Sequence, residues 1–177
     1  MKRLLIIVDM QRDFVSGALG TPEAQALVAP MGTYIRNFAG PVIFTQDTHQ
    51  RDYLTTLEGR HLPVEHCLEG SEGWQIVPEL LEAAGERAQI FTKETFGSVA
   101  LGEYVRTLDD LEAVEMCGVC TGICVLSNAV LLRACRPELP LYVISDLCAC
   151  VSPDSHERSL LALKLLQADL ISARGSC

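Results

Sequence analysis

The sequence predicts a single doubly wound (Rossmann-like) α/β domain, residues 1–177, with a mostly parallel sheet of five or six strands flanked by helices. Unbroken apolar runs of about four to eight residues recur along the chain, which is typical of strands buried on both faces. Helical patterns separate the runs and are long enough to form crossover connections between parallel strands. The chain of 177 residues shows no internal repeat and no linker, and its length suits one domain.

The expected strands are these apolar runs in chain order. They are unbroken rather than alternating, so both faces of the sheet should be covered by helices. They lie at 4–8 (LLIIV), 41–45 (PVIFT), 88–92 (AQIFT), 113–119 (AVEMCGV) and 141–145 (LYVIS), with a sixth candidate at 169–173 (DLISA).

The expected helices lie between the strands, at 22–38, 74–85, 98–107, 122–135 and 152–168. The first opens with Thr21-Pro22-Glu23, a capping residue followed by proline at the first helical position and an acid in the first turn. The second is interrupted by Pro78 and closed by Gly85. Much of the segment 47–73 fits no regular element, and a loop of that length inside a compact domain is usually functional or disordered.

The overall composition excludes several classes of partner. A formal charge of −9 and a pI near 4.8 argue against nucleic acid and anionic membranes, which bind clustered Lys and Arg. No apolar stretch approaches the ~20 residues of a membrane span, and the apolar run 4–8 is cut by Asp9 and is too short for a signal peptide. With 49% hydrophobic residues and a mean hydropathy of +0.22, we expect a well-filled interior or a buried subunit interface, and hence a homo-oligomer.

The eight cysteines, without an export signal, indicate a reducing compartment, and we expect a cytoplasmic protein with free thiols. Cys117 and Cys120 match C-x-x-C, but no second pair completes a four-thiolate zinc site. The cysteines interpreted as core or surface filler are Cys135, Cys148, Cys150 and Cys177.

Polar side chains follow four of the expected strands. Asp9 follows the first, Asp47 and His49 the second, Lys93 the third, and a turn containing Cys124 the fourth. Ligands of open α/β sheets bind beyond the carboxyl ends of the strands, so these side chains should meet at one edge. Each alone has an alternative reading, such as a turn residue for Asp9 or a solvated loop lysine for Lys93. Their coincidence at one edge favours an active site.

Among the thiols, Cys124 has the strongest claim to be a nucleophile. If a helix begins near Gly122, the sulfur lies in the first turn, where free N–H groups and the helix dipole stabilise a thiolate, and a nearby lysine lowers its pKa further. The same N–H groups can hold an oxyanion. The alternative is that Cys124 only packs the helix against the sheet.

The loop that follows the second strand concentrates potential metal ligands. Oxygen and imidazole donors of this kind suit a divalent transition metal, although solvated loop residues are the alternative interpretation. The candidates are Asp47, His49, Glu58, His61 and His66. The remaining histidine, His156, lies in the first turn of the last expected helix and is expected at the surface.

Several ordered segments resemble the signature segments of the isochorismatase-like cysteine hydrolases, and within them the nicotinamidase and pyrazinamidase branch. The resemblance runs from residue 4 to about residue 172 and rests on LLIIVDMQRDF, GALG, TQDTH, LPVEHCLEGSEGW, FTKETFGS and GVCTGICVLSNAV. It implies a catalytic triad of Asp9, Lys93 and Cys124, and an oxyanion hole formed by the backbone N–H groups of Cys120 and Cys124 around a cis Val119-Cys120 bond. It also implies a metal site of Asp47, His49, Glu58 and His66, with His61 as the alternative to Glu58.

The resemblance further implies an amidase that cleaves a small primary carboxamide, nicotinamide first, through a Cys124 thioester. One divalent metal would anchor the substrate, zinc first, with manganese or iron as alternatives, and Phe14 and Trp74 are candidate pocket walls. Two departures leave the substrate open: Gly122 stands where many members carry Asp, and Thr48 where nicotinamidases often carry Trp. The rival hypotheses are a metal-independent relative acting on another amide or an enol ether, and a non-catalytic binding protein on the same scaffold.

Overall fold

The computed structural model describes residues 3–174, and the centre of this part is a six-stranded, all-parallel sheet in the order β3-β2-β1-β4-β5-β6. The predicted fold class is confirmed, and each of the six apolar runs forms a strand. The strands are β1 (Arg3–Val8), β2 (Val42–Asp47), β3 (Ala88–Lys93), β4 (Ala113–Val119), β5 (Leu141–Ala149) and β6 (Asp169–Ile171).

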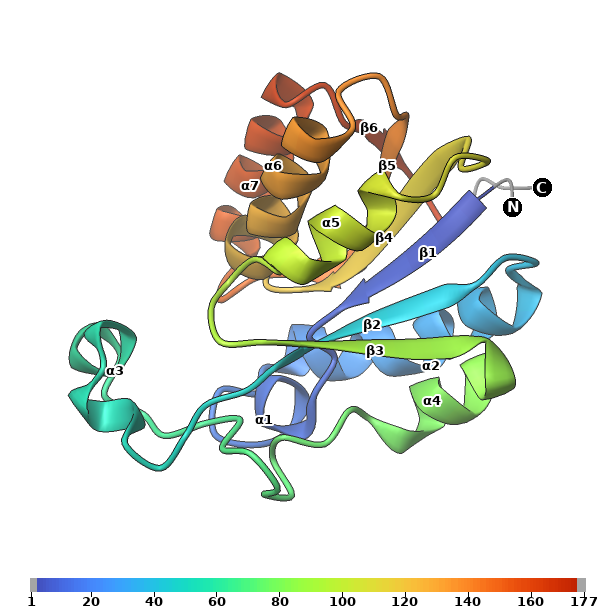
Figure 1. Ribbon diagram of the computed structural model, residues 1–177. Helices are drawn as coiled ribbons and strands as arrows, with labels where there is room; N and C mark the ends of the chain where they lie inside the picture. Colours follow the sequence, from blue (N-terminus) through green and yellow to red (C-terminus); the bar gives the residue numbers. More distant parts are fainter. Residues whose placement is uncertain (1–2, 175–177) are drawn as a thin grey trace.

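Helices cover both faces of this sheet, as the apolar strands require. On one face α2 (Pro22–Asn37) packs against α4 (Pro78–Ala84), and on the other α5 (Val99–Arg106), α6 (Leu126–Cys135) and α7 (Pro153–Leu165) lie side by side (Figure 1). β1, β2 and β4 are almost wholly buried between these layers. None of the helices described here is both long and apolar enough to cross a membrane.

Two helical segments differ from the prediction. The helix expected at 74–85 begins only at Pro78, because proline has no N–H to donate and suits the first position rather than an interior one. The helix expected at 122–135 opens with a π-helical turn, Thr121–Val125, before α6 continues it. The short helices α1 (Arg12–Val15) and α3 (Leu57–His61) were not predicted, since a single turn carries little periodic signal.

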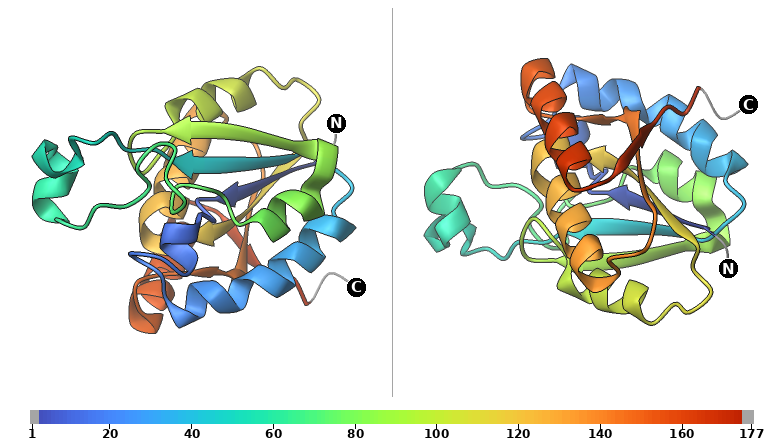
Figure 2. Two further views of the ribbon diagram at one scale, coloured as in Figure 1. Left: turned by 90° about the horizontal axis from the view of Figure 1, so that it is seen from below. Right: turned by 90° about the horizontal axis from the view of Figure 1, so that it is seen from above.

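The segment from Thr48 to Val77 is ordered and carries α3 away from the sheet, as both views in Figure 2 show. Its two ends are joined close to β2: the His49 N–H donates to the Cys67 carbonyl (2.9 Å), and the Glu69 N–H donates to the His49 carbonyl (2.8 Å). This pairing holds residues 47–49 beside residues 66–69, which are far apart in the chain.

The strand order reverses between β1 and β4, so the sheet has its switch point there. β2 and β3 end level with each other, since Asp47 is the register partner of Lys93, and β1 ends beside β4, with Val8 opposite Gly118. The carboxyl ends of these four strands therefore form one edge, where such sheets bind ligands.

The described cysteines are all free thiols. Cys148 and Cys150 are buried and Cys135 is half-buried, in keeping with packing roles, whereas Cys177 lies outside the described residues.

Candidate active site

Three of the predicted side chains, Asp9, Lys93 and Cys124, meet at the carboxyl edge of the sheet. The Lys93 Nζ lies 2.7 Å from Asp9 Oδ2 and 3.9 Å from Cys124 Sγ. All three residues are buried, with 0%, 5% and 6% of their surface exposed for Asp9, Lys93 and Cys124. The structure thus assembles a carboxyl group, an ammonium group and a thiol that are far apart in the chain.

Thr45 holds the Asp9 carboxyl group in one orientation. The Asp9 backbone has a φ of 49°, in the left-handed region that few non-glycine residues occupy. The Asp9 N–H donates to Thr45 Oγ1 (3.1 Å), and the Thr45 hydroxyl donates to Asp9 Oδ1 (2.6 Å). One carboxyl oxygen is therefore fixed by Thr45, and the other faces Lys93.

The charges of these groups depend on one another. Burial raises the pKa of the Asp9 carboxyl, and the Lys93 ammonium opposes this shift. Burial alone would lower the pKa of Lys93, but Asp9, Cys124 and Asp47 raise it overall, so Lys93 stays protonated. Asp9 is thus a stronger base than an exposed carboxylate, which suits a group that takes up and gives back a proton.

The sequence analysis expected the helix terminus and Lys93 to lower the pKa of the Cys124 thiol, but burial opposes them. Burial and the Asp9 carboxyl raise the pKa of the Cys124 thiol well above its ordinary value, and Lys93 opposes them without overcoming them. The sequence suggested the helix terminus and the lysine but could not show how deeply the sulfur is buried. A thiol in this setting needs a base when it reacts, and Asp9, which shares Lys93 as a neighbour with Cys124, can serve as that base.

The turn Thr121–Val125, hereafter the Cys124 turn, follows a cis peptide bond between Val119 and Cys120, as the resemblance implied. The Cys120 carbonyl accepts the N–H groups of Ile123 (3.0 Å) and Val125 (3.2 Å). Cys124 lies between Ile123 and Val125 in the chain, and its own N–H takes no part in these two hydrogen bonds. Before the turn, Gly118 has a φ of 123°, and a Cβ there would lie 2.1 Å from the Val8 carbonyl oxygen, so only glycine fits.

Asn128, which the sequence analysis missed, ties the Cys124 turn to the loop after β3. Its side-chain amide donates to the Cys124 carbonyl (2.8 Å), and its Oδ1 accepts the Ser98 N–H (3.0 Å). The only signal in the sequence was a polar asparagine inside the mainly apolar helix expected at 122–135.

Four of the five candidate metal ligands form a cluster next to the triad: one donor atom from each of Asp47, His49, Glu58 and His66 lies within 4.8 Å of the others. His61 is exposed and outside this cluster, so the geometry selects Glu58 over His61.

The donors in this cluster fit a divalent metal ion. His49 Nε2 is buried and faces the carboxylates of Asp47 and Glu58, but it makes no well-aligned hydrogen bond among the described residues. His66 Nδ1 lies 2.8 Å from the Val64 carbonyl; when it donates there, the Nε2 lone pair is free to face the cluster, as is common for metal-binding histidines. Two imidazoles with two carboxylates suit zinc, iron or manganese.

Asp47 belongs to both groups of side chains. Its Oδ1 lies 3.0 Å from Lys93 Nζ, and its Oδ2 lies 3.0 Å from His49 Nε2. The fully buried Gln11 fixes its position, because the Gln11 side chain donates to the Asp47 carbonyl (2.8 Å) and accepts the Asp47 N–H (2.7 Å). The sequence analysis also missed Gln11, whose role rests on a contact between residues 36 positions apart.

A cavity of about 160 Å³ lies between Cys124 and the metal-ligand cluster. Its lining combines Cys124 and Cys120 with Asp47, Glu58 and His66 of the cluster, and the other lining residues are apolar or small: Phe14, Leu19, Thr21, Ala24, Leu62, Phe96, Val119, Ile123, Ala149, Cys150 and Val151. No Lys or Arg is among these residues. An apolar cavity of about 150 Å³ accommodates one benzene ring, so this one suits a small, largely apolar ligand.

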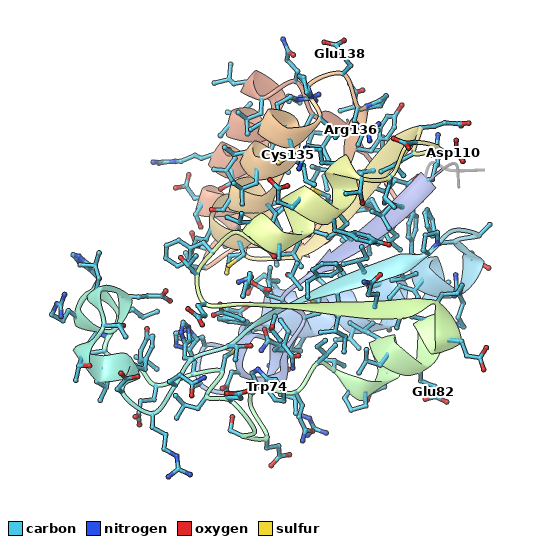
Figure 3. The ribbon with its side chains drawn as sticks, viewed as in Figure 1. Trp74, Glu82, Asp110, Cys135, Arg136 and Glu138 are labelled. Atoms are coloured by element: carbon cyan, nitrogen blue, oxygen red, sulfur yellow. The ribbon has the colours of Figure 1, made fainter. Side chains whose placement is uncertain are left out.

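The structure places one of the two predicted pocket walls in this lining. Phe14 lines the cavity, and its ring packs 5.4 Å from that of His66. Trp74, labelled in Figure 3, does not line it, which corrects the prediction. The Trp74 ring N–H donates to Thr48 Oγ1 (2.9 Å), and its carbonyl accepts from Gln11 and Gln46, so it supports the loop around Asp47 instead.

Comparisons with known proteins agree with this geometry. A family model described as "Isochorismatase domain" matches residues 3–175. The structure of a pyrazinamidase from Pyrococcus horikoshii in complex with zinc is similar, with 28% identity, a TM-score of 0.81, and 96% of this chain and 98% of that chain covered. A nicotinamidase/pyrazinamidase from Bacillus subtilis has 25% identity and a TM-score of 0.77, covering 97% and 100%. An N-carbamoylsarcosine amidase from Thermoplasma acidophilum shares the fold at 23% identity and a TM-score of 0.79, covering 98% and 97%. A search of curated proteins found no match.

Proposed function

The chain belongs to the isochorismatase family and is a hydrolase of amide C–N bonds, and from this premise we propose that its substrate is a small primary carboxamide, most directly nicotinamide, converted to nicotinate and ammonia. One observation carries the proposal: Cys124 and the metal-ligand cluster line the same ring-sized cavity. A planar amide with a ring nitrogen can present its carboxamide to the sulfur and its nitrogen to the cluster.

In the first half of the proposed reaction, the Cys124 sulfur attacks the amide carbon while its proton passes to Asp9. The backbone N–H groups of Cys120 and Cys124 hold the oxyanion of the tetrahedral intermediate. Asp9 then donates the proton to the amide nitrogen, the C–N bond breaks, and ammonia leaves. Lys93 favours the ionised Asp9 carboxylate before it takes the proton and after it has given the proton up.

In the second half, a water molecule hydrolyses the thioester. Asp9 removes a proton from the water as the oxygen attacks the acyl carbon, and the C–S bond breaks. The proton returns to the Cys124 sulfur, and the carboxylic acid product is released. Asp9 therefore acts as base and acid in both halves, which explains why its pKa must lie above that of an exposed carboxyl.

Asp47, His49, Glu58 and His66 would hold one divalent metal ion, zinc first, with manganese or iron as alternatives. When bound, this ion would supply a Lewis-acid contact for the ring nitrogen of the substrate, which orients the carboxamide toward Cys124. The zinc complex of the similar pyrazinamidase supports this part of the proposal.

A panel of amides tests the substrate. We expect ammonia release from nicotinamide and pyrazinamide, and much slower release from benzamide, which has the ring but lacks the ring nitrogen. N-carbamoylsarcosine should be a poor substrate, because it lacks the aromatic ring that the largely apolar lining of the cavity would contact. Activity toward N-carbamoylsarcosine with none toward the ring amides would contradict the proposal.

Metal analysis of purified variants tests the cluster. The wild-type protein should contain about one ion per chain, and His66→Ala should lose most of it, because a buried ligand disappears. The matched control is His61→Ala, which removes an exposed histidine of the same loop and should keep the metal. Equal metal content in the two variants would argue against the cluster, and full activity after chelation would favour the metal-independent alternative.

A further inference from the structure

His156, expected at the surface, is half-buried and contacts the Cys124 turn, which corrects the prediction. Its Nδ1 lies 2.8 Å from the hydroxyl oxygen of Thr121. Thr121 is fully buried and is the first residue of the turn. The sequence placed His156 correctly in the first turn of α7 but could not show that α7 packs against the Cys124 turn.

α7 also occupies the space beside the second residue of the turn. A Cβ on Gly122 would lie 2.2 Å from the hydroxyl oxygen of Ser159, and that hydroxyl donates to the Ser155 carbonyl (2.5 Å). A side chain at position 122 would therefore require the Ser159 side chain to move. The turn instead receives a polar contact from α7, through His156.

The first turn of α7, which carries His156, is held by several hydrogen bonds. α7 begins with a capping box, in which Ser152 Oγ accepts the Ser155 N–H (3.2 Å) and Ser155 Oγ accepts the Ser152 N–H (3.0 Å). The His156 N–H donates to the Ser152 carbonyl (3.0 Å), and Pro153 stands at the first helical position. Hydrogen bonds thus run without a break from the start of α7 to Thr121.

We propose that His156 is a positioning residue for the amidase reaction: through Thr121 it fixes the Cys124 turn, and with it the sulfur and the oxyanion-binding N–H groups. The inference rests on the proposed function for its kinetic part only. Oxyanion-hole donors lie about 2.7–3.1 Å from the oxyanion they stabilise. A small shift of the turn therefore weakens the hydrogen bonds that stabilise the transition state. The substrate ring would be held by the cluster on the other side of the cavity, so substrate binding should change little.

The kinetic test compares His156→Ala, His156→Asn and Thr121→Val. We expect His156→Ala and Thr121→Val each to lower kcat about tenfold with little change in KM or metal content. A tenfold loss corresponds to weakening about one hydrogen bond between the turn and the oxyanion. Asparagine can still bond the Thr121 hydroxyl, so His156→Asn should recover most of the activity. The double variant should be no worse than either single variant, because both changes remove the same contact. Glu157→Ala, exposed on the same helix, is the control.

A second measurement needs no substrate. The rate at which iodoacetamide alkylates Cys124, followed by peptide mass spectrometry, should fall several-fold in His156→Ala and Thr121→Val. The reason is that the sulfur leaves its place beside the Lys93 ammonium, which favours the thiolate, and beside Asp9, the proposed base. This readout tests the inference even if no amide in the panel is hydrolysed. Unchanged or faster alkylation would overturn it, as would a loss of kcat that follows only the folded fraction and is not rescued by His156→Asn.

Discussion

Replacing Cys124 by alanine is expected to lower amide hydrolysis on the order of 10⁴-fold or more, while the fold and the metal content are kept. The reason is that Cys124 is the thiol placed beside Lys93 and Asp9, and these two groups remain in the variant without a sulfur to activate. The measurements are ammonia release and the intact mass of the protein during turnover, which should show an acyl adduct on the wild type and none on the variant.

The matched control for this variant is Cys117→Ala. Cys117 is fully buried in β4, seven positions before Cys124, so the substitution also removes a buried sulfur atom close to the site. Burial raises the pKa of the Cys117 thiol, and the residue does not line the cavity. Near-normal activity in Cys117→Ala separates the loss of a nucleophile from the loss of packing. Near-wild-type activity in Cys124→Ala would instead remove the nucleophile assignment.

The sequence predicted the position of a site residue correctly where that residue directly follows a strand. Asp9, Asp47 and Lys93 each stand at the end of an unbroken apolar run, and parallel strands bring their carboxyl ends to one edge. The position of the six strands and the meeting of the triad follow from that pattern alone. The choice of Glu58 over His61 did not follow, because it depends on which residue of α3 faces back toward β2.

The sequence was uninformative where distant segments meet through one polar contact. Gln11, Thr45 and Asn128 each fix a residue of the site by hydrogen bonds, yet none of them belongs to a pattern that spacing or periodicity reveals. The contact between His156 and Thr121 is of the same kind. The rise in the pKa of the Cys124 thiol on burial was also out of reach, because the cost of burying a thiolate depends on the full packing around the sulfur.

Replacing Asp9 by asparagine is expected to lower kcat about 10²- to 10⁴-fold, since the amide cannot accept the proton that the carboxylate carries in both halves of the reaction. The shape of the site should survive, because an asparagine Oδ1 can still accept from the Thr45 hydroxyl, and Lys93 keeps Asp47 as a partner. Asp52→Asn, the same change at an exposed position, is the control and should have no effect.

The pH profile gives this prediction its sharpest form. Burial raises the pKa of Asp9, and Lys93 opposes the shift, so wild-type kcat/KM should fall on the acid side at a pH above the ordinary Asp range. The sign follows from the role: Asp9 must be ionised to take the Cys124 proton, so activity is lost as the pH falls through its pKa. The residual activity of Asp9→Asn should lack that acid limb. If the activity of Asp9→Asn still falls at acid pH with the wild-type midpoint, another group titrates there and Asp9 is not the base.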